Sequence, residues 1–262
     1  MTRTFFKFFT ATLLVIISTT ASASLQVFPT RVVLTPDQKV FQVSIRHRGD
    51  KPETYRISTR YYKMNTDGSM SVADKVSPDD RSADGMFRYS PKKITLKPNE
   101  EQVVRILLRR SAGKDKGIYR THLYFRPSDK FDGPLKMSDT KAAMNLSAKV
   151  AVAVPVVVQL SKPEATPLIE DFKLKNEKDG KTHFSVKLKT EDQHYAFGDF
   201  RILNSTGDTV WEVKGVSTYL KERIVSYPLT ERLPAGKYTL QFEDKTVPGE
   251  SKNYQTALEF KY

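Results

Sequence analysis

Short segments of strand-forming residues, separated by turn residues, constrain the fold of this chain more than any other feature of its sequence. The segments are rich in Val, Ile, Thr, Tyr and Phe, and a helical period of apolar residues hardly occurs. Turn signals such as HRGDKP, NTDG and LKPNEE separate them. The segments in the first half of the chain are residues 25–34, 40–47, 53–62, 86–96, 101–108, 117–126 and 142–160. Seven strands at this spacing predict an immunoglobulin-like β-sandwich.

A second series of such segments follows a proline-containing stretch, SKPEATP, at residues 161–167. Two prolines stiffen this stretch, which is typical of a linker between domains. The later segments are residues 168–175, 182–189, 198–203, 209–214, 223–229, 236–243 and 254–261. We therefore expect an all-β protein of two tandem immunoglobulin-like sandwiches, at residues 24–160 and 161–262.

The first 23 residues have the pattern of a secretory signal peptide. Arg3 and Lys7 precede an apolar run at residues 8–17, and small residues follow up to Ala23. The alternative is a membrane anchor, but the apolar run is shorter than the roughly 20 residues that span a bilayer. The later apolar stretch at residues 150–158 is also short and contains Pro155. We expect cleavage after Ala23 and no membrane insertion of the mature chain.

Composition adds two constraints on this exported chain. It has no cysteine, so its core must hold without disulfides. Its net charge is +13, of which Arg3 and Lys7 contribute two. The basic residues are spread along alternating strands and do not gather in one run or on one helix face, so the charge does not predict a nucleic-acid partner.

No pattern of catalytic or metal-binding residues occurs in the sequence. His47, His122, His183 and His194 are widely separated, and none has a partner at metal-ligand spacing. A thiol nucleophile, a G-x-S-x-G motif and a phosphate-binding glycine loop are all missing from the sequence. We therefore expect no enzymatic activity, no metal and no cofactor.

Residues 142–160, AAMNLSAKVAVAVPVVVQL, change character halfway along. The first half alternates, and because successive side chains of a strand point to opposite faces, one face is apolar. That face carries Ala142, Met144, Leu146 and Ala148. The second half is apolar on both sides, which predicts a strand that is buried on both faces. The first half is then either an interaction surface or an edge strand that only completes its own sandwich.

Four segments of the first domain resemble, in order and spacing, the periplasmic pilus-assembly chaperones of the chaperone-usher pathway. They are TRVVLTPDQKVFQVSIRHRGDKPETYRIST, YSPKKITLKPNEEQVVRILLRR, KGIYRTHLYFRP and NLSAKVAVAVPVVVQL. The turn and strand around Leu96, Pro98 and Arg105 are the most specific part of this resemblance. The resemblance covers residues 25–160, whereas the second domain agrees only in length, position and strand-rich character.

The resemblance implies a non-enzymatic chaperone of fimbrium biogenesis, located in the periplasm, whose two domains meet as a boomerang. In such proteins the last strand of the first domain lends alternate apolar side chains to an incomplete pilus subunit, a form of β-augmentation. Its partners are pilus subunits and an outer-membrane usher. By this resemblance, the donor series in the present chain is Ala142, Met144, Leu146 and Ala148.

The resemblance also implies a site for the C-terminal carboxylate of the subunit, formed by an arginine and a lysine in the cleft between the domains. Arg31, in PTRVVL, matches the arginine. The sequence departs from the pattern at the lysine, because the expected position carries Ala151 and the nearest base is Lys149. Arg31 and Lys149 are therefore the expected carboxylate anchors; in an extended strand Lys149 would keep the same face, about 7 Å along the strand from the usual position.

A different class of protein also fits tandem sandwiches: a structural or adhesive surface protein, either a pilus subunit or a ligand-binding module. A pilus subunit of this type should lack a strand and carry an N-terminal donor extension. Here strand-like sequence begins at residue 25 and the first domain has a full set of strands, which favours the chaperone.

Overall fold

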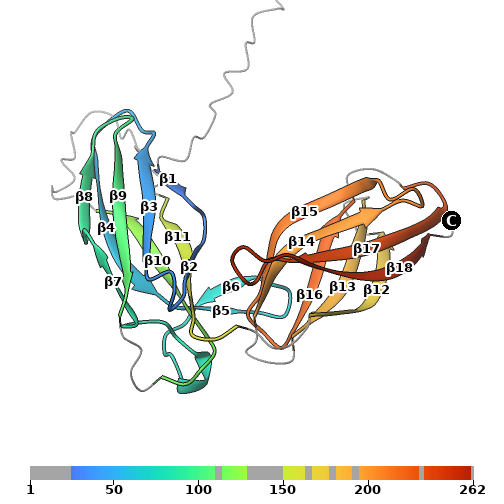
Figure 1. Ribbon diagram of the computed structural model, residues 1–262. Helices are drawn as coiled ribbons and strands as arrows, with labels where there is room; N and C mark the ends of the chain where they lie inside the picture. Colours follow the sequence, from blue (N-terminus) through green and yellow to red (C-terminus); the bar gives the residue numbers. More distant parts are fainter. Residues whose placement is uncertain are drawn as a thin grey trace, which may run out of the picture.

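The protein consists of two β-sandwiches that meet end to end at an angle, so that the molecule is bent (Figure 1). The computed structural model describes residues 25–109, 114–128, 150–162, 167–176, 181–190, 195–229 and 233–260. This arrangement confirms the expected all-β class with two tandem sandwiches. In the described residues, no helix is both long enough and apolar enough to cross a bilayer.

The first sandwich is formed by two facing sheets, with strand orders β1-β3-β9-β7 and β2-β11-β10-β4-β8. Its strands are β1 (Leu25–Phe28), β2 (Val32–Leu34), β3 (Val40–His47), β4 (Glu53–Arg60), β7 (Phe87–Ser90), β8 (Lys93–Leu96), β9 (Glu101–Leu108), β10 (Ile118–Pro127) and β11 (Val152–Gln159). Alternate side chains of both sheets meet in one core, in which Tyr55, Phe125 and Leu123 are fully buried.

Two segments that the sequence predicts as single strands are each divided by a proline. Residues 25–34 form β1, which pairs with β3, and β2, which runs parallel to β11 in the other sheet. Pro29 lies between them, and Pro91 likewise separates β7 from β8. A proline has no N–H to donate to a ladder, so the chain leaves one sheet there and enters the other.

A hairpin of β5 (Tyr62–Met64) and β6 (Met70–Val72) extends from the first sandwich toward the second (Figure 1). Its turn is the NTDG signal, but sequence analysis did not predict the hairpin. The backbone N–H of Ile224, in the second sandwich, donates a 2.8 Å hydrogen bond to the carbonyl oxygen of Thr66 in this turn. A short 3-10 helix, η1 (Pro78–Asp80), follows the hairpin.

The second sandwich has sheets of order β12-β13-β16 and β15-β14-β17-β18. Its strands are β12 (Leu168–Asn176), β13 (Thr182–Lys189), β14 (Ala196–Leu203), β15 (Thr209–Thr218), β16 (Glu222–Pro228), β17 (Gly236–Asp244) and β18 (Lys252–Phe260). Phe184, Phe200 and Phe242 are fully buried in its core, beside Trp211. Each of these strands overlaps a predicted segment.

Strand β11 is buried on both faces in its second half, as the apolar sequence predicts. Val154, Val156 and Val158 face the core of the first sandwich. Val157 faces the opposite way and packs against Tyr195 of the second sandwich. The second face of β11 is therefore covered by the other domain.

Candidate functional site

The junction between the sandwiches is built on the outer face of sheet β2-β11-β10. Val33, Ile118 and Val157 of this face pack against aromatic side chains of the second sandwich. The rings of Tyr195 and Tyr219 stack there with centroids 5.5 Å apart. On the far side of the junction, Nε2 of Gln159 donates a 2.7 Å hydrogen bond to the carbonyl oxygen of Thr246. These contacts join the two domains through β11 and its neighbours.

Arg31 lies at this junction, directly before β2. Its guanidinium carbon is 3.8 Å from the ring centroid of Phe197 and 5.3 Å from that of Tyr195. Its Nε and Nη2 atoms are buried and have no hydrogen-bond acceptor among the described residues. Burial lowers the pKa of Arg31 to about 10, although the charges of Tyr219 and Asp244 act in the opposite direction. The cation–π contact offsets part of the cost of burying this charge.

The register of the sheet places Arg31 in a row with His122. Val32 pairs with Val156 in the parallel ladder, so Arg31 is level with Pro155, and Pro155 pairs with His122 on β10. Residues paired across neighbouring strands point to the same face. The row therefore presents Arg31 and His122 on the face that meets the second sandwich.

His122 is a buried and neutral member of this row. Its side chain is 6% exposed, and its Nδ1 has no hydrogen-bond partner among the described residues. Its ring contacts the edge of Tyr62, with centroids 4.8 Å apart. Burial, together with the charge of Arg120, lowers its pKa to about 4.

Arg120 is a second buried arginine on the same face, one row further along. It pairs with Val157 and is 6% exposed. Its Nη2 donates hydrogen bonds to the Tyr61 hydroxyl at 3.2 Å and to the Tyr62 carbonyl at 2.8 Å. Its guanidinium carbon lies 3.8 Å from the centroid of the Tyr219 ring, and its Nη1 has no acceptor among the described residues. A buried donor without an acceptor costs about 1–3 kcal/mol.

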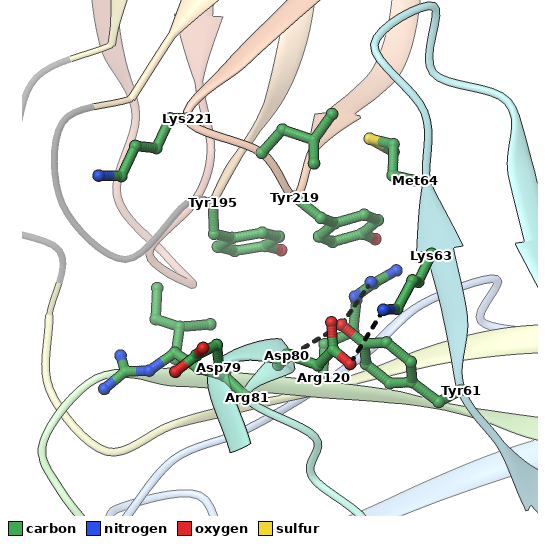
Figure 2. Close-up of a pocket in the computed structure, with 12 residues that line it drawn as sticks. Tyr61, Lys63, Met64, Asp79, Asp80, Arg81, Arg120, Tyr195, Tyr219 and Lys221 are labelled. Atoms are coloured by element: carbon green, nitrogen blue, oxygen red, sulfur yellow. Dashed lines mark hydrogen bonds and ion pairs between the residues drawn. The ribbon is translucent and has the colours of Figure 1, made fainter. Parts of the chain in front are cut away.

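A cavity of about 440 Å³ lies between the domains beside Arg120. Figure 2 shows the rings of Tyr195 and Tyr219 on one side of it and Arg120 with Asp80 on the other. Its lining residues are Tyr61, Lys63, Met64, Asp79, Asp80, Arg81, Ile118, Arg120, Tyr195, Tyr219, Leu220 and Lys221. A group of His, Asp or Glu side chains suited to a metal ion does not occur in the described part of the chain.

Of the residues predicted from the sequence, Arg31 lies at the junction between the domains, against Tyr195 and Phe197. Lys149 and the expected donor series are outside the described residues. The series is Ala142, Met144, Leu146 and Ala148. Sequence analysis missed Arg120 and Tyr195. Arg120 gave no clear local signal, because its strand, Ile118–Pro127, also carries the polar residues Thr121, His122 and Arg126. Nothing local distinguishes Tyr195 either.

The first half of β11 has an open edge. In the described residues, β2 pairs with β11 only at residues 156–158, and β10 covers the other side. Among the described residues, therefore, no strand pairs with residues 152–155 on the β2 side. Val150, just before β11, is 55% exposed. An open edge of this kind offers unpaired N–H and C=O groups to an added strand.

No family model matches the sequence, and no curated protein does. Among solved structures, the chain is similar to the YadV chaperone at 12% identity, over 90% of this chain and 100% of that chain, with a TM-score of 0.46. It is similar to a chain of the complex of the Salmonella enterica SafA pilin with the SafB chaperone, at 12% identity, over 91% and 98% of the two chains, with a TM-score of 0.47. A further similarity is to a chain of the CsuC–CsuE chaperone–tip adhesion subunit complex of Acinetobacter baumannii, at 12% identity, over 89% and 98%, with a TM-score of 0.47.

Proposed function

We propose that this protein is a periplasmic chaperone that binds pilus subunits by donor-strand complementation and delivers them to an outer-membrane usher. The observation that carries the proposal is the position of Arg31. It lies between the two sandwiches, and two of its N–H donors have no acceptor among the described residues. The proposal assigns these donors to the C-terminal carboxylate of a bound subunit.

The chemistry of Arg31 suits this role. Its Nε and Nη2 lie on one edge of the guanidinium, and this edge matches the two oxygens of a carboxylate. Both atoms are buried in the free protein, and the ring of Phe197 lies against the guanidinium. Capture of a carboxylate therefore requires the aromatic side chains of the second sandwich to move aside.

The open edge of β11 supports the second part of the proposal. The side chains of Val152, Val154 and Val156 turn toward the core of the first sandwich. A strand continued backwards without a bulge keeps even-numbered residues on that face. The expected donor series is even-numbered, so it would extend the core-facing row into the groove of a subunit. Full burial of Met144 and Leu146 would contribute roughly 1.5–3 kcal/mol each.

Co-expression with candidate pilus subunits tests the proposal. We expect recovery of a one-to-one complex from the periplasm. Leu146→Asp should abolish the complex while leaving the free protein folded, because the added charge is buried without a partner only in the complex. Asn145→Asp, on the opposite face, should bind nearly as well as the parent. Equal loss from both variants would contradict the donor-strand assignment.

A further inference from the structure

The cavity beside Arg120 is lined by two buried donors that lack acceptors among the described residues, one from each sandwich. They are Nη1 of Arg120 and the hydroxyl of Tyr195, in side chains that are 6% and 4% exposed. Neither has a hydrogen-bond partner among the described residues, and both residues line the cavity. Buried donors are almost always paired, so two of them around one cavity indicate a place for an acceptor.

The charge of the lining favours a negatively charged acceptor. Lys63, Arg81, Arg120 and Lys221 are its bases, whereas Asp79 and Asp80 are its acids. The carboxylate of Asp80 already has partners within the protein. It accepts a 2.7 Å hydrogen bond from the backbone N–H of Ser77 and lies 3.4 Å from Nζ of Lys63. The hydrogen bonds and the ion pair lower the pKa of Asp80, which keeps it ionised. Lys63 and Asp80 neutralise each other, so three bases, Arg81, Arg120 and Lys221, face one acid, Asp79.

The register of the sheet sets the spacing between Arg31 and this cavity. Arg31 is level with Pro155, while Arg120 pairs with Val157 on the next strand. Strand β11 lies between the strands of these two arginines, and their levels along it differ by two residues. The backbones of Arg31 and Arg120 are therefore about 12 Å apart. An extended peptide covers such a span in about four residues.

We infer that this cavity is a second anion site, at which Arg120 and Tyr195 bind the carboxylate of an acidic side chain near the C-terminus of the bound partner. The inference rests on the proposed function, in which Arg31 binds the chain end itself. The partner is then recognised at two points, and Arg120 is the cation of the second point.

Binding of a short peptide to the mature chain tests this inference. The probe is the tetrapeptide acetyl-Glu-Gly-Ser-Tyr, with its binding followed by NMR through the Nε–H resonance of Arg120. We expect saturable binding that weakens about tenfold when Gln replaces Glu in the peptide, because the neutral amide lacks the charge. Tyr195→Phe should remove most of this preference for Glu. This variant keeps the ring that stacks on Tyr219 and removes a hydroxyl that has no hydrogen-bond partner among the described residues, so it should stay folded.

Two controls separate the cavity from the site at Arg31. Tyr89→Phe, in a strand of the opposite sheet, should leave the preference for Glu unchanged. Amidation of the peptide C-terminus should weaken binding in Tyr195→Phe as much as in the parent, since the chain end lies at Arg31. If amidation has no effect but the preference for Glu persists, the role of Arg31 in the proposed function fails and the cavity inference stands.

Three results would overturn the inference. The first is equal affinity for the Glu and Gln peptides. The second is an unchanged Arg120 resonance up to about 10 mM peptide, a concentration at which even weak ion pairs populate. The third is loss of the amidation effect in Tyr195→Phe, which would mean that the cavity takes the chain end.

Discussion

The guanidinium carbon of Arg31, in the first sandwich, lies 3.8 Å from the centre of the Phe197 ring in the second. This contact couples the proposed carboxylate site to the arrangement of the two domains. Phe197→Ala should therefore loosen the junction and lower the free energy of unfolding by about 2 kcal/mol, since a partly buried ring is lost. Urea unfolding measures the loss, and small-angle scattering should show a larger radius of gyration.

Phe41→Ala is the matched control for this change. Phe41 is also a partly buried phenylalanine, but it packs against the core of the first sandwich. We expect a similar loss of stability without a change in the radius of gyration. A radius that grows equally in both variants would show that Phe197 has no special role in holding the domains.

The hairpin turn at Gly68 should be sensitive to a single methyl group. Gly68 has φ +85°, and a Cβ there would lie 2.1 Å from Nη2 of Arg223 in the second sandwich. Gly85 has a similar φ of +78°, but no atom lies within 4 Å of its added Cβ. Both Gly→Ala variants carry the cost of a left-handed backbone, about 1 kcal/mol. Gly68→Ala should cost about 1 kcal/mol more, because Arg223 must move.

Chemical unfolding of the two glycine variants, measured side by side, gives this difference directly. Equal destabilisation would mean that the hairpin does not press against the second sandwich in solution.

The stability of the protein should fall in mildly acidic solution because of His122. Its pKa is lowered from 6.5 to about 4 by burial and by the charge of Arg120. Between these values the unfolded chain binds a proton that the folded protein does not, so stability falls as pH falls from 6.5 toward 4. From pH 7 to pH 5 the loss should be about 2 kcal/mol.

His122→Gln removes the titrating group and should flatten this part of the pH profile. The measurement is the free energy of unfolding at pH 7 and pH 5 in both proteins. An equally steep loss in the variant would assign the effect to other groups.

Much of this fold follows from local sequence rules. Alternating apolar residues and turn signals predicted nearly every strand, because each strand buries one face in its own sandwich. The division of residues 25–34 was missed, although Pro29 marks the point where the chain changes sheets. The β5–β6 hairpin was missed because its strands are only three residues long and its partner, β16, is distant in sequence.

The candidate site was less predictable than the fold. Arg31 was found because a local motif, PTRVVL, resembles a family pattern. Arg120 and Tyr195 become part of a site only through contacts between the two sandwiches, since each packs against a surface of the other domain. The position of Arg31 and Arg120 relative to each other also depends on the register with which β2 and β10 pair with β11, and a single sequence does not reveal that register. These relationships are tertiary, so the local sequence pattern around each residue does not predict them.

The affinity of Arg31 variants for a recovered subunit tests the central claim most directly. Arg31→Ala should weaken the one-to-one complex by 2–5 kcal/mol, or roughly thirty- to several-thousand-fold in dissociation constant. Arg31→Lys should also weaken it markedly, because an ammonium cannot make the two-pronged contact. Both variants should remain folded, which circular dichroism checks. A dissociation constant for Arg31→Ala equal to that of the parent would contradict the claim that Arg31 binds the carboxylate of a pilus subunit.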